Sequence, residues 1–237
     1  MKRKLLPLLL MLATGVASAQ TAPEAAPAAP EVVAAVDFAD TAFVLICSAL
    51  VLLMTPALAF FYGGLSRSKS VLNTMMMSFT AIGVITIVWV VAGYSIAFGD
   101  EPMGAYFGSF QNVMLAGIDK DSTATTFNAA HLIPKYVFVM FQATFAIIAA
   151  ALISGALVDR MKFGAYIVFI ALWSVLVYAP VAHWVWDASG WLFADGALDF
   201  AGGTVVHINA GVSALVAAKL LGPRLHTTKN GAIPHNI

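Results

Sequence analysis

The side chain best suited to chemistry in this sequence is His207, which lies in an apolar run between two glycines. Gly203 and Gly211 stand four residues on either side of it, so all three share one face of a helix. An imidazole on such a strip can line a narrow lumen, and its unperturbed pKa of about 6.5 suits proton exchange near neutral pH. The alternative is a histidine that only hydrogen-bonds between helices.

Asp199 stands just ahead of the same run and is followed by Phe200-Ala201-Gly202-Gly203. Its carboxylate can accept hydrogen bonds from the free amides of a first helical turn. We therefore interpret Asp199 as a structural cap that fixes the entrance of the helix. A helix that begins near Asp199 places His207 about 12 Å along its axis.

Two groups of aromatic residues are predicted near the ends of two apolar runs. Such residues usually pack between helices or anchor them at an interface, but their ring faces can also hold a desolvated cation. The residues alone leave both functions open. The first group is Phe138, Phe141 and Phe145, and the second is Trp184, Trp186 and Trp191.

A metal-dependent membrane enzyme is a third possibility, because His183 and Asp187 are four residues apart and His131 lies in a preceding loop. No further ligand stands at helical spacing, so we predict no metal site, no cofactor and no enzymatic activity. The single cysteine, Cys47, can form neither an intrachain disulfide nor a thiolate metal site.

The composition is that of a membrane protein. Hydrophobic residues make up 61% of the chain and charged residues 10%, whereas soluble domains have about 45–50% and about 25%. Twelve basic residues balance twelve acidic ones, and no basic cluster beyond the N-terminus suggests nucleic acid as a partner.

Five long uncharged runs are predicted to cross the bilayer as helices, since about 20 residues span its core and backbone groups in lipid must bond within the segment. A sixth uncharged stretch, Pro102–Ile118, is interrupted by proline and glycines and is predicted to be an outer loop. The five runs are Thr41–Ser66, Ser70–Gly99, Tyr136–Val158, Phe163–Trp186 and Phe200–Ala218.

The N-terminus and the positive charges predict the orientation. Residues 1–19 are typical of a cleaved signal peptide, and residues 20–39 of a flexible periplasmic lead-in, so the domain of interest is 40–237. The segments then predicted to be cytoplasmic carry seven basic residues against two outside, Lys120 and Lys135. The seven are Arg67, Lys69, Arg160, Lys162, Lys219, Arg224 and Lys229.

The segment Gly196–Ala210, GALDFAGGTVVHINA, resembles the signature of the ammonium transporter (Amt) family. Four shorter motifs agree in order and spacing, and the resemblance covers roughly Asp40 to Ile237. The cleavable signal and the motifs favour the bacterial Amt branch over the Rh-type branch. The four motifs are FFYGGL at 60–65, GYSIAFG at 93–99, FQATFA at 141–146 and AHWVW at 182–186.

The resemblance implies an all-α membrane fold in which this chain is the five-helix N-terminal half of an eleven-span inverted-repeat transporter. It further implies a homotrimer in the bacterial inner membrane, with one pore for ammonium or ammonia in each subunit. A second pore histidine, a second gate phenylalanine and a recruitment serine are expected beyond residue 237. A cytoplasmic PII-type regulator is an expected partner, and an ammonium sensor with a signalling module is the alternative function.

The resemblance also implies roles for individual residues. Trp186 and Phe145 are expected to form an outer recruitment site for ammonium, and Phe145 and Phe141 a gate below it. His207 is expected to line the pore, and Asp199 to support the architecture of the recruitment site.

Overall fold

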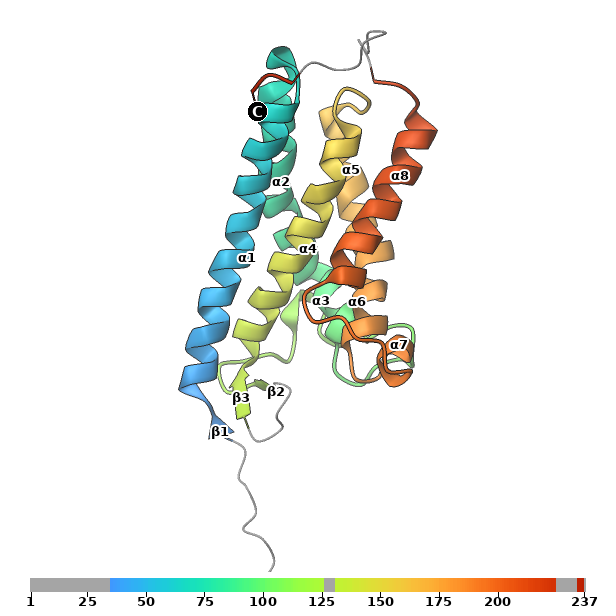
Figure 1. Cartoon of the computed structure of the whole chain (residues 1–237). Coiled ribbons are helices and arrows are strands. Elements are labelled where there is room, and N and C mark those ends of the chain that lie inside the picture. Colours follow the sequence, from blue (N-terminus) through green and yellow to red (C-terminus); the bar gives the residue numbers. More distant parts are fainter. Residues whose placement is uncertain (1–34, 126–130, 225–233, 237) are drawn as a thin grey trace, which may run out of the picture. The chain divides into compact units, whose positions relative to one another are not determined.

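The computed structural model describes residues 35–125, 131–224 and 234–236 (Figure 1). The expected signal peptide, most of the expected lead-in, and Lys229 lie outside these ranges. The described residues all belong to one unit, Ala34–Ile237.

The prediction of five membrane-spanning segments is confirmed. Within the described ranges, five helical segments are long and apolar enough to cross a membrane by length and composition. The stretch Pro102–Ile118 is an irregular loop with one short turn, η3 (Val113–Leu115), as expected. The segments are α1 (Phe38–Leu65); η1 (Ser68–Ser70), α2 (Val71–Val88), η2 (Trp89–Gly93) and α3 (Tyr94–Phe98); α4 (Lys135–Leu157); α5 (Phe163–Trp173), η4 (Ser174–Tyr178), α6 (Ala179–Trp186) and the short α7 (Trp191–Ala194); and η5 (Gly203–Ile208) with α8 (Asn209–Leu221).

Three of the spans contain a π-helical turn, which the sequence pattern does not predict. These turns are η2, η4 and η5, and in them backbone bonds reach five residues back instead of four. The turn η4 ends two residues before Pro180, which has no N–H to donate and would otherwise interrupt the α-helical ladder. The fourth span therefore continues through its proline without ending.

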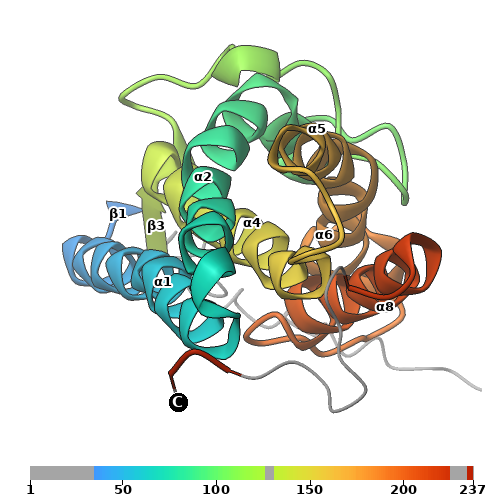
Figure 2. The ribbon, with the colours of Figure 1, turned by 90° about the horizontal axis from the view of Figure 1, so that it is seen from above.

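The helix α4 is the centre of the bundle. It lies between α1 and α2 on one side and α8 on the other (Figure 2). In its most apolar stretch 61% of the residues are buried, against 17% in α1. Ala146, Ala149 and Ala150 are fully buried, and small residues of this kind let neighbouring helices approach closely.

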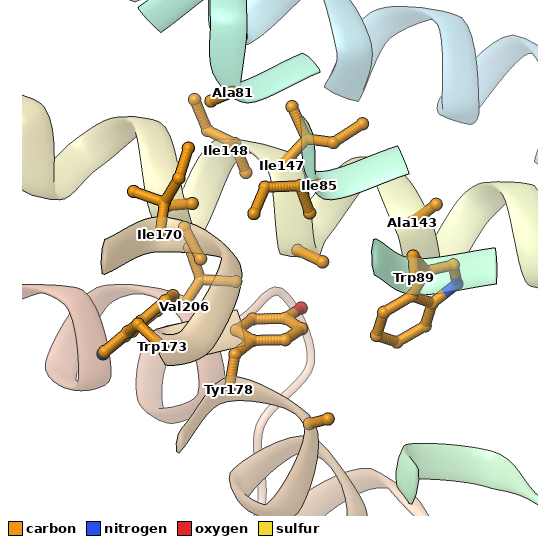
Figure 3. Close-up of a cluster of buried hydrophobic side chains, with 14 of the residues drawn as sticks. Ala81, Ile85, Trp89, Ala143, Ile147, Ile148, Ile170, Trp173, Tyr178 and Val206 are labelled. Carbon is orange, nitrogen blue, oxygen red and sulfur yellow. The ribbon is translucent and has the colours of Figure 1, made fainter. Parts of the chain in front are cut away.

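Large apolar side chains from α4 and from the second, fourth and fifth spans interdigitate (Figure 3). The Trp89 ring meets the Tyr178 ring edge-on, with centroids 6.2 Å apart, and its Nε1–H donates to the carbonyl of Val139 at 3.1 Å. Val206 of η5 belongs to the same cluster. This packing fixes η5, and with it His207, against the fourth span.

The end of the bundle at which α1 begins, which the charge distribution predicts to be the outer end, carries a three-stranded sheet. Strand β1 (Ala35–Val36) pairs in parallel with β3 (His131–Pro134), and β2 (Thr123–Thr125) pairs antiparallel on its other side. The flexible lead-in was expected to extend to residue 39, but in the structure its last residues already form β1 and the start of α1. They are ordered because β3 supplies a pairing edge and the helix α1 already begins at Phe38.

Asp37 explains why α1 begins at that position. Its Oδ1 accepts the backbone N–H groups of Ala39 and Asp40 at 2.8 and 2.9 Å, and its Oδ2 lies 2.7 Å from Nδ1 of His131. The bond from the Asp40 amide, followed by the bond with His131, holds the pKa of Asp37 below its usual value. The cap thus connects the start of the first helix to strand β3.

The opposite end is held by Asp159, in the turn between α4 and α5. Its carboxylate accepts Arg67 Nε at 3.0 Å and Ser70 Oγ at 2.8 Å. Burial raises the pKa of Asp159, but the hydrogen bonds from Arg67 and Ser70 outweigh it and hold the pKa below its usual value. Two of the segments predicted to be cytoplasmic therefore meet at one end of the bundle.

Candidate functional site at an outer aromatic cluster and His207

Three aromatic side chains, which we call the outer aromatic cluster, meet where α4 faces the end of α6. Phe141 and Phe145 are one helical turn apart, and their rings pack edge to face with centroids 4.9 Å apart. Phe145 also packs edge to face on Trp186, the last residue of α6, at 5.5 Å. All three are half-buried, so the cluster keeps part of its ring surface accessible.

Trp186 is fixed by a hydrogen bond to the chain that leads into the fifth span. Its Nε1–H donates to the main-chain carbonyl of Asp199 at 3.0 Å. A buried indole usually finds such a partner, and the bond sets the orientation of the ring. Asp199 therefore supports Trp186 through its backbone.

The carboxylate of Asp199 is used in a different way. Its Oδ1 accepts the backbone N–H of Gly203 at 2.7 Å, and its Oδ2 accepts those of Thr204 and Val205 at 2.8 and 2.9 Å. These are the free donors of the first turn of η5, so the carboxylate caps this helix as expected.

The fifth helix begins later than expected, at Gly203 instead of near Asp199. Gly202 precedes it with a left-handed φ of +82°, and a Cβ at this position would lie 2.6 Å from Cγ2 of Val206. Only glycine fits this bend. His207 is consequently about 6 Å from the start of its helix, roughly half the distance predicted from the sequence.

His207 is exposed, and its Nδ1 lies 3.0 Å from the carbonyl oxygen of Gly202. This acceptor favours the neutral tautomer that carries its proton on Nδ1. In that tautomer Nε2 has a lone pair available to accept a proton.

The imidazole lies on an apolar groove of about 320 Å³ between α1 and α4. His207 is the polar member of the lining. Gly211 was expected to allow close approach of another surface. Among the described residues, no atom lies within 4 Å of the position that a Cβ on Gly211 would occupy. The other lining residues are Met54, Ala57, Leu58, Phe61, Ile148 and Leu152.

A family model described as the Ammonium Transporter Family matches residues 42–237 of this sequence. The chain belongs to this family. The resemblance drawn from the motifs is thereby confirmed.

Individual relatives agree. The chain is 53% identical over 205 residues to the ammonium transporter of Aquifex aeolicus, covering 86% of this chain and 46% of the relative. It is 48% identical over 198 residues to that of Bacillus subtilis, covering 84% and 47%. The chain thus spans about half the length of these curated relatives.

Solved structures of the family share the fold. Candida albicans Mep2 superposes with a TM-score of 0.74 at 34% identity, over 85% of this chain and 44% of Mep2. A protein described as a sensor Amt protein superposes with a TM-score of 0.72 at 26% identity, over 83% and 49%. The prediction of a five-helix half of the family fold is confirmed.

The other aromatic residues singled out in the sequence lie outside the outer aromatic cluster. Phe138 packs edge to face on Phe98 of α3 at 5.2 Å. Trp184 and Trp191 pair with each other at 6.1 Å, and Trp184 Nε1 donates to the carbonyl of Tyr106 in the outer loop. These three residues pack or hold the loop.

The side chains considered for a metal site do not converge. The ring nitrogens of His183 face the carbonyls of Ala97 and Gly104, and Asp187 stands 3.9 Å from the ring. Among the described residues, the one group of three with metal-ligand spacing is His131 with Asp37 and Asp40. In that group Asp37 already caps α1. Sequence spacing could not reveal the backbone partners of His183, because carbonyl groups are present at every residue.

Proposed function

We propose that this chain forms one half of a pore that conducts ammonium as ammonia. The proposal rests on one arrangement of side chains. Phe141 packs on Phe145 and Phe145 on Trp186, and the indole of Trp186 donates to the carbonyl of Asp199. The carboxylate of Asp199 caps the helix η5, which places His207 on an apolar groove. Family membership supports the substrate, since the curated relatives are described as ammonium transporters.

In this proposal Trp186 and Phe145 recruit the cation. A ring face attracts a cation by about 0.5–2 kcal/mol, depending on how far both are desolvated. The bond from Trp186 to Asp199 keeps the ring in place without occupying its face. The recruited ammonium therefore exchanges part of its hydration for a fixed aromatic surface.

Phe145 and Phe141 form the gate below the recruitment site. Their edge-to-face pair presents apolar surface where a hydrated ion would have to pass. Because desolvation disfavours the charged form of a base, ammonium at this boundary is favoured to transfer a proton to water on the solvent side and to pass the gate as ammonia. Potassium has no proton to release, which gives the pore its selectivity.

His207 lines the conducting part of the pore. The Gly202 carbonyl at Nδ1 leaves Nε2 available as an acceptor along the groove. A neutral imidazole in this position can accept a hydrogen bond from ammonia or exchange a proton with it. Asp199 acts indirectly, through the cap and through Trp186.

We further propose a homotrimer in the bacterial inner membrane, with the outer sheet and the outer aromatic cluster on the periplasmic side. The excess of basic residues at the opposite end supports this orientation. A PII-type regulator is the proposed cytoplasmic partner. The likeness to the sensor Amt protein supports an ammonium sensor as the second candidate function.

The test is uptake by the whole transporter in a host that lacks its own ammonium transport. At low external ammonium and acidic pH, where ammonia diffusion is negligible, we expect growth rescue and saturable methylammonium uptake that potassium does not inhibit. Normal insertion without uptake would overturn the proposal. Ammonium binding by the purified protein without any uptake would favour the sensor.

A further inference from the structure

Three consecutive carbonyl groups of the outer loop each lie within hydrogen-bonding distance of a donor group at the corner between α6 and α7. Side chains provide two of these groups and a main-chain amide the third, so the segment Gly104–Tyr106 is held along its length. The contacts are His183 Nε2 to Gly104 O at 3.1 Å, Trp191 N to Ala105 O at 3.1 Å, and Trp184 Nε1 to Tyr106 O at 2.8 Å.

His183 differs from the other two because it is fully buried and has a second partner. Its Nδ1 lies 2.9 Å from the carbonyl oxygen of Ala97, at the end of α3. A neutral imidazole donates one of these two bonds, and an imidazolium donates both. One side chain thus packs the last turns of α6 against both the second span and the outer loop, and it donates a hydrogen bond to at least one of them.

The turn that His183 holds is the one that carries Trp186, three residues later. On its other side this turn is bonded by the Trp186 indole to Asp199. The chain then returns closely across the end of α6, where a Cβ on Gly190 would lie only 2.1 Å from the carbonyl oxygen of His183. The end of α6 therefore has little freedom to shift while His183 keeps its bonds.

We propose that His183 is a positioning residue, which holds the Trp186 ring where it recruits ammonium. This inference rests on the proposed function. It assigns to His183 no contact with the transported species, because its side chain is buried. Its Nδ1 faces the carbonyl of Ala97, and its Nε2 faces the carbonyl of Gly104 and, at 3.4 Å, Oγ of Ser189. Loss of His183 weakens recruitment and leaves the conduction steps below it unchanged.

The experiment compares His183→Ala and His183→Gln with Trp184→Phe in the whole transporter. Trp184→Phe is the matched control, since it removes a bond to the same loop but not the attachment of α6 to α3. Each variant is measured for methylammonium uptake against concentration, for the amount of folded trimer, and for hydrogen exchange of the loop amides.

For His183→Ala we expect the half-saturation concentration to rise by about 2- to 30-fold, the range expected for loss of the aromatic contact itself. The maximal rate per folded protein should change less than about twofold, since conduction does not pass through this residue. His183→Gln keeps an amide donor and should recover part of the affinity. It also serves as the test if the alanine variant does not fold. Trp184→Phe should speed exchange in the loop while the half-saturation concentration stays at the wild-type value.

A wild-type half-saturation concentration in a folded His183 variant would overturn the inference while leaving the proposed function intact. An equal rise in Trp184→Phe would overturn it as well, because loosening of the loop would then be sufficient. An inactive wild-type protein would instead remove the proposed function, and the positioning role with it.

Discussion

The outer aromatic cluster and the His207 groove are built differently. At the cluster, Trp186 and Asp199 are bonded to groups within this chain, and the rings of Phe141 and Phe145 pack on each other. His207 is exposed on a groove, and no atom of the described residues lies within 4 Å of where a Cβ on Gly211 would be. The rings proposed to recruit a cation therefore have their ring and hydrogen-bond partners within this chain, whereas the groove proposed as part of a lumen is lined on one side by the described residues.

His207→Asp in the whole transporter is the substitution expected to have the largest effect, and it tests whether the His207 groove takes part in conduction. A carboxylate on an apolar groove is costly to desolvate and attracts cations of any kind. We expect ammonia conduction to fall by about tenfold or more, or discrimination against potassium to be lost. The measurements are uptake and potassium competition in reconstituted vesicles.

The exposure of His207 makes this test informative, because the variant should still insert and assemble. A purely structural histidine predicts misfolding instead. His207→Gln, which stays neutral, is the control for charge. Wild-type flux and selectivity in folded His207→Asp protein would exclude His207 from the mechanism.

Trp186→Ala should have a smaller effect, and this effect should be on the affinity for ammonium instead of on conduction. If the ring contributes about 0.5–2 kcal/mol to recruitment, its removal should raise the half-saturation concentration by about 2- to 30-fold, with the amount of folded protein unchanged. Trp191→Ala removes an exposed ring outside the outer aromatic cluster and should leave that concentration unchanged. If both variants keep the wild-type concentration dependence, Trp186 only anchors its helix.

Asp199→Asn is expected to have the smallest effect and shows whether the two regions are coupled. The main-chain bond to Trp186 is retained, while the charged cap of η5 is weakened. We expect stability to fall by about 1 kcal/mol, measured by thermal unfolding in detergent, with affinity nearly unchanged. Asp195→Asn, at an exposed neighbouring position, is the control.

An equal loss of stability in the two variants would show that the Asp199 carboxylate does not stabilise the helix start. If Asp199→Asn alone changed both the half-saturation concentration and the discrimination against potassium, the outer aromatic cluster and the His207 groove would be coupled through Asp199.

Much of the fold could be predicted from the sequence, because the bilayer imposes simple conditions on it. A segment in hydrocarbon needs about 20 apolar residues and must satisfy its own backbone bonds, so five uncharged runs predict five helices. The spacing of Phe141 and Phe145 predicts rings on one face of α4, and the position of Asp199 predicts a capped helix. Each of these features depends on residues close together in the chain.

The tertiary structure alone decided the remaining features, and they share a physical cause. Trp186 bonds the carbonyl of Asp199, and His183 faces those of Ala97 and Gly104. Every residue carries a carbonyl group, so no residue type marks which one will be the acceptor. The late start of η5 likewise depends on the bend at Gly202 and its contact with Val206. Such partners are selected only when distant segments pack together, and that packing places the ring of Trp186 and the imidazole of His207.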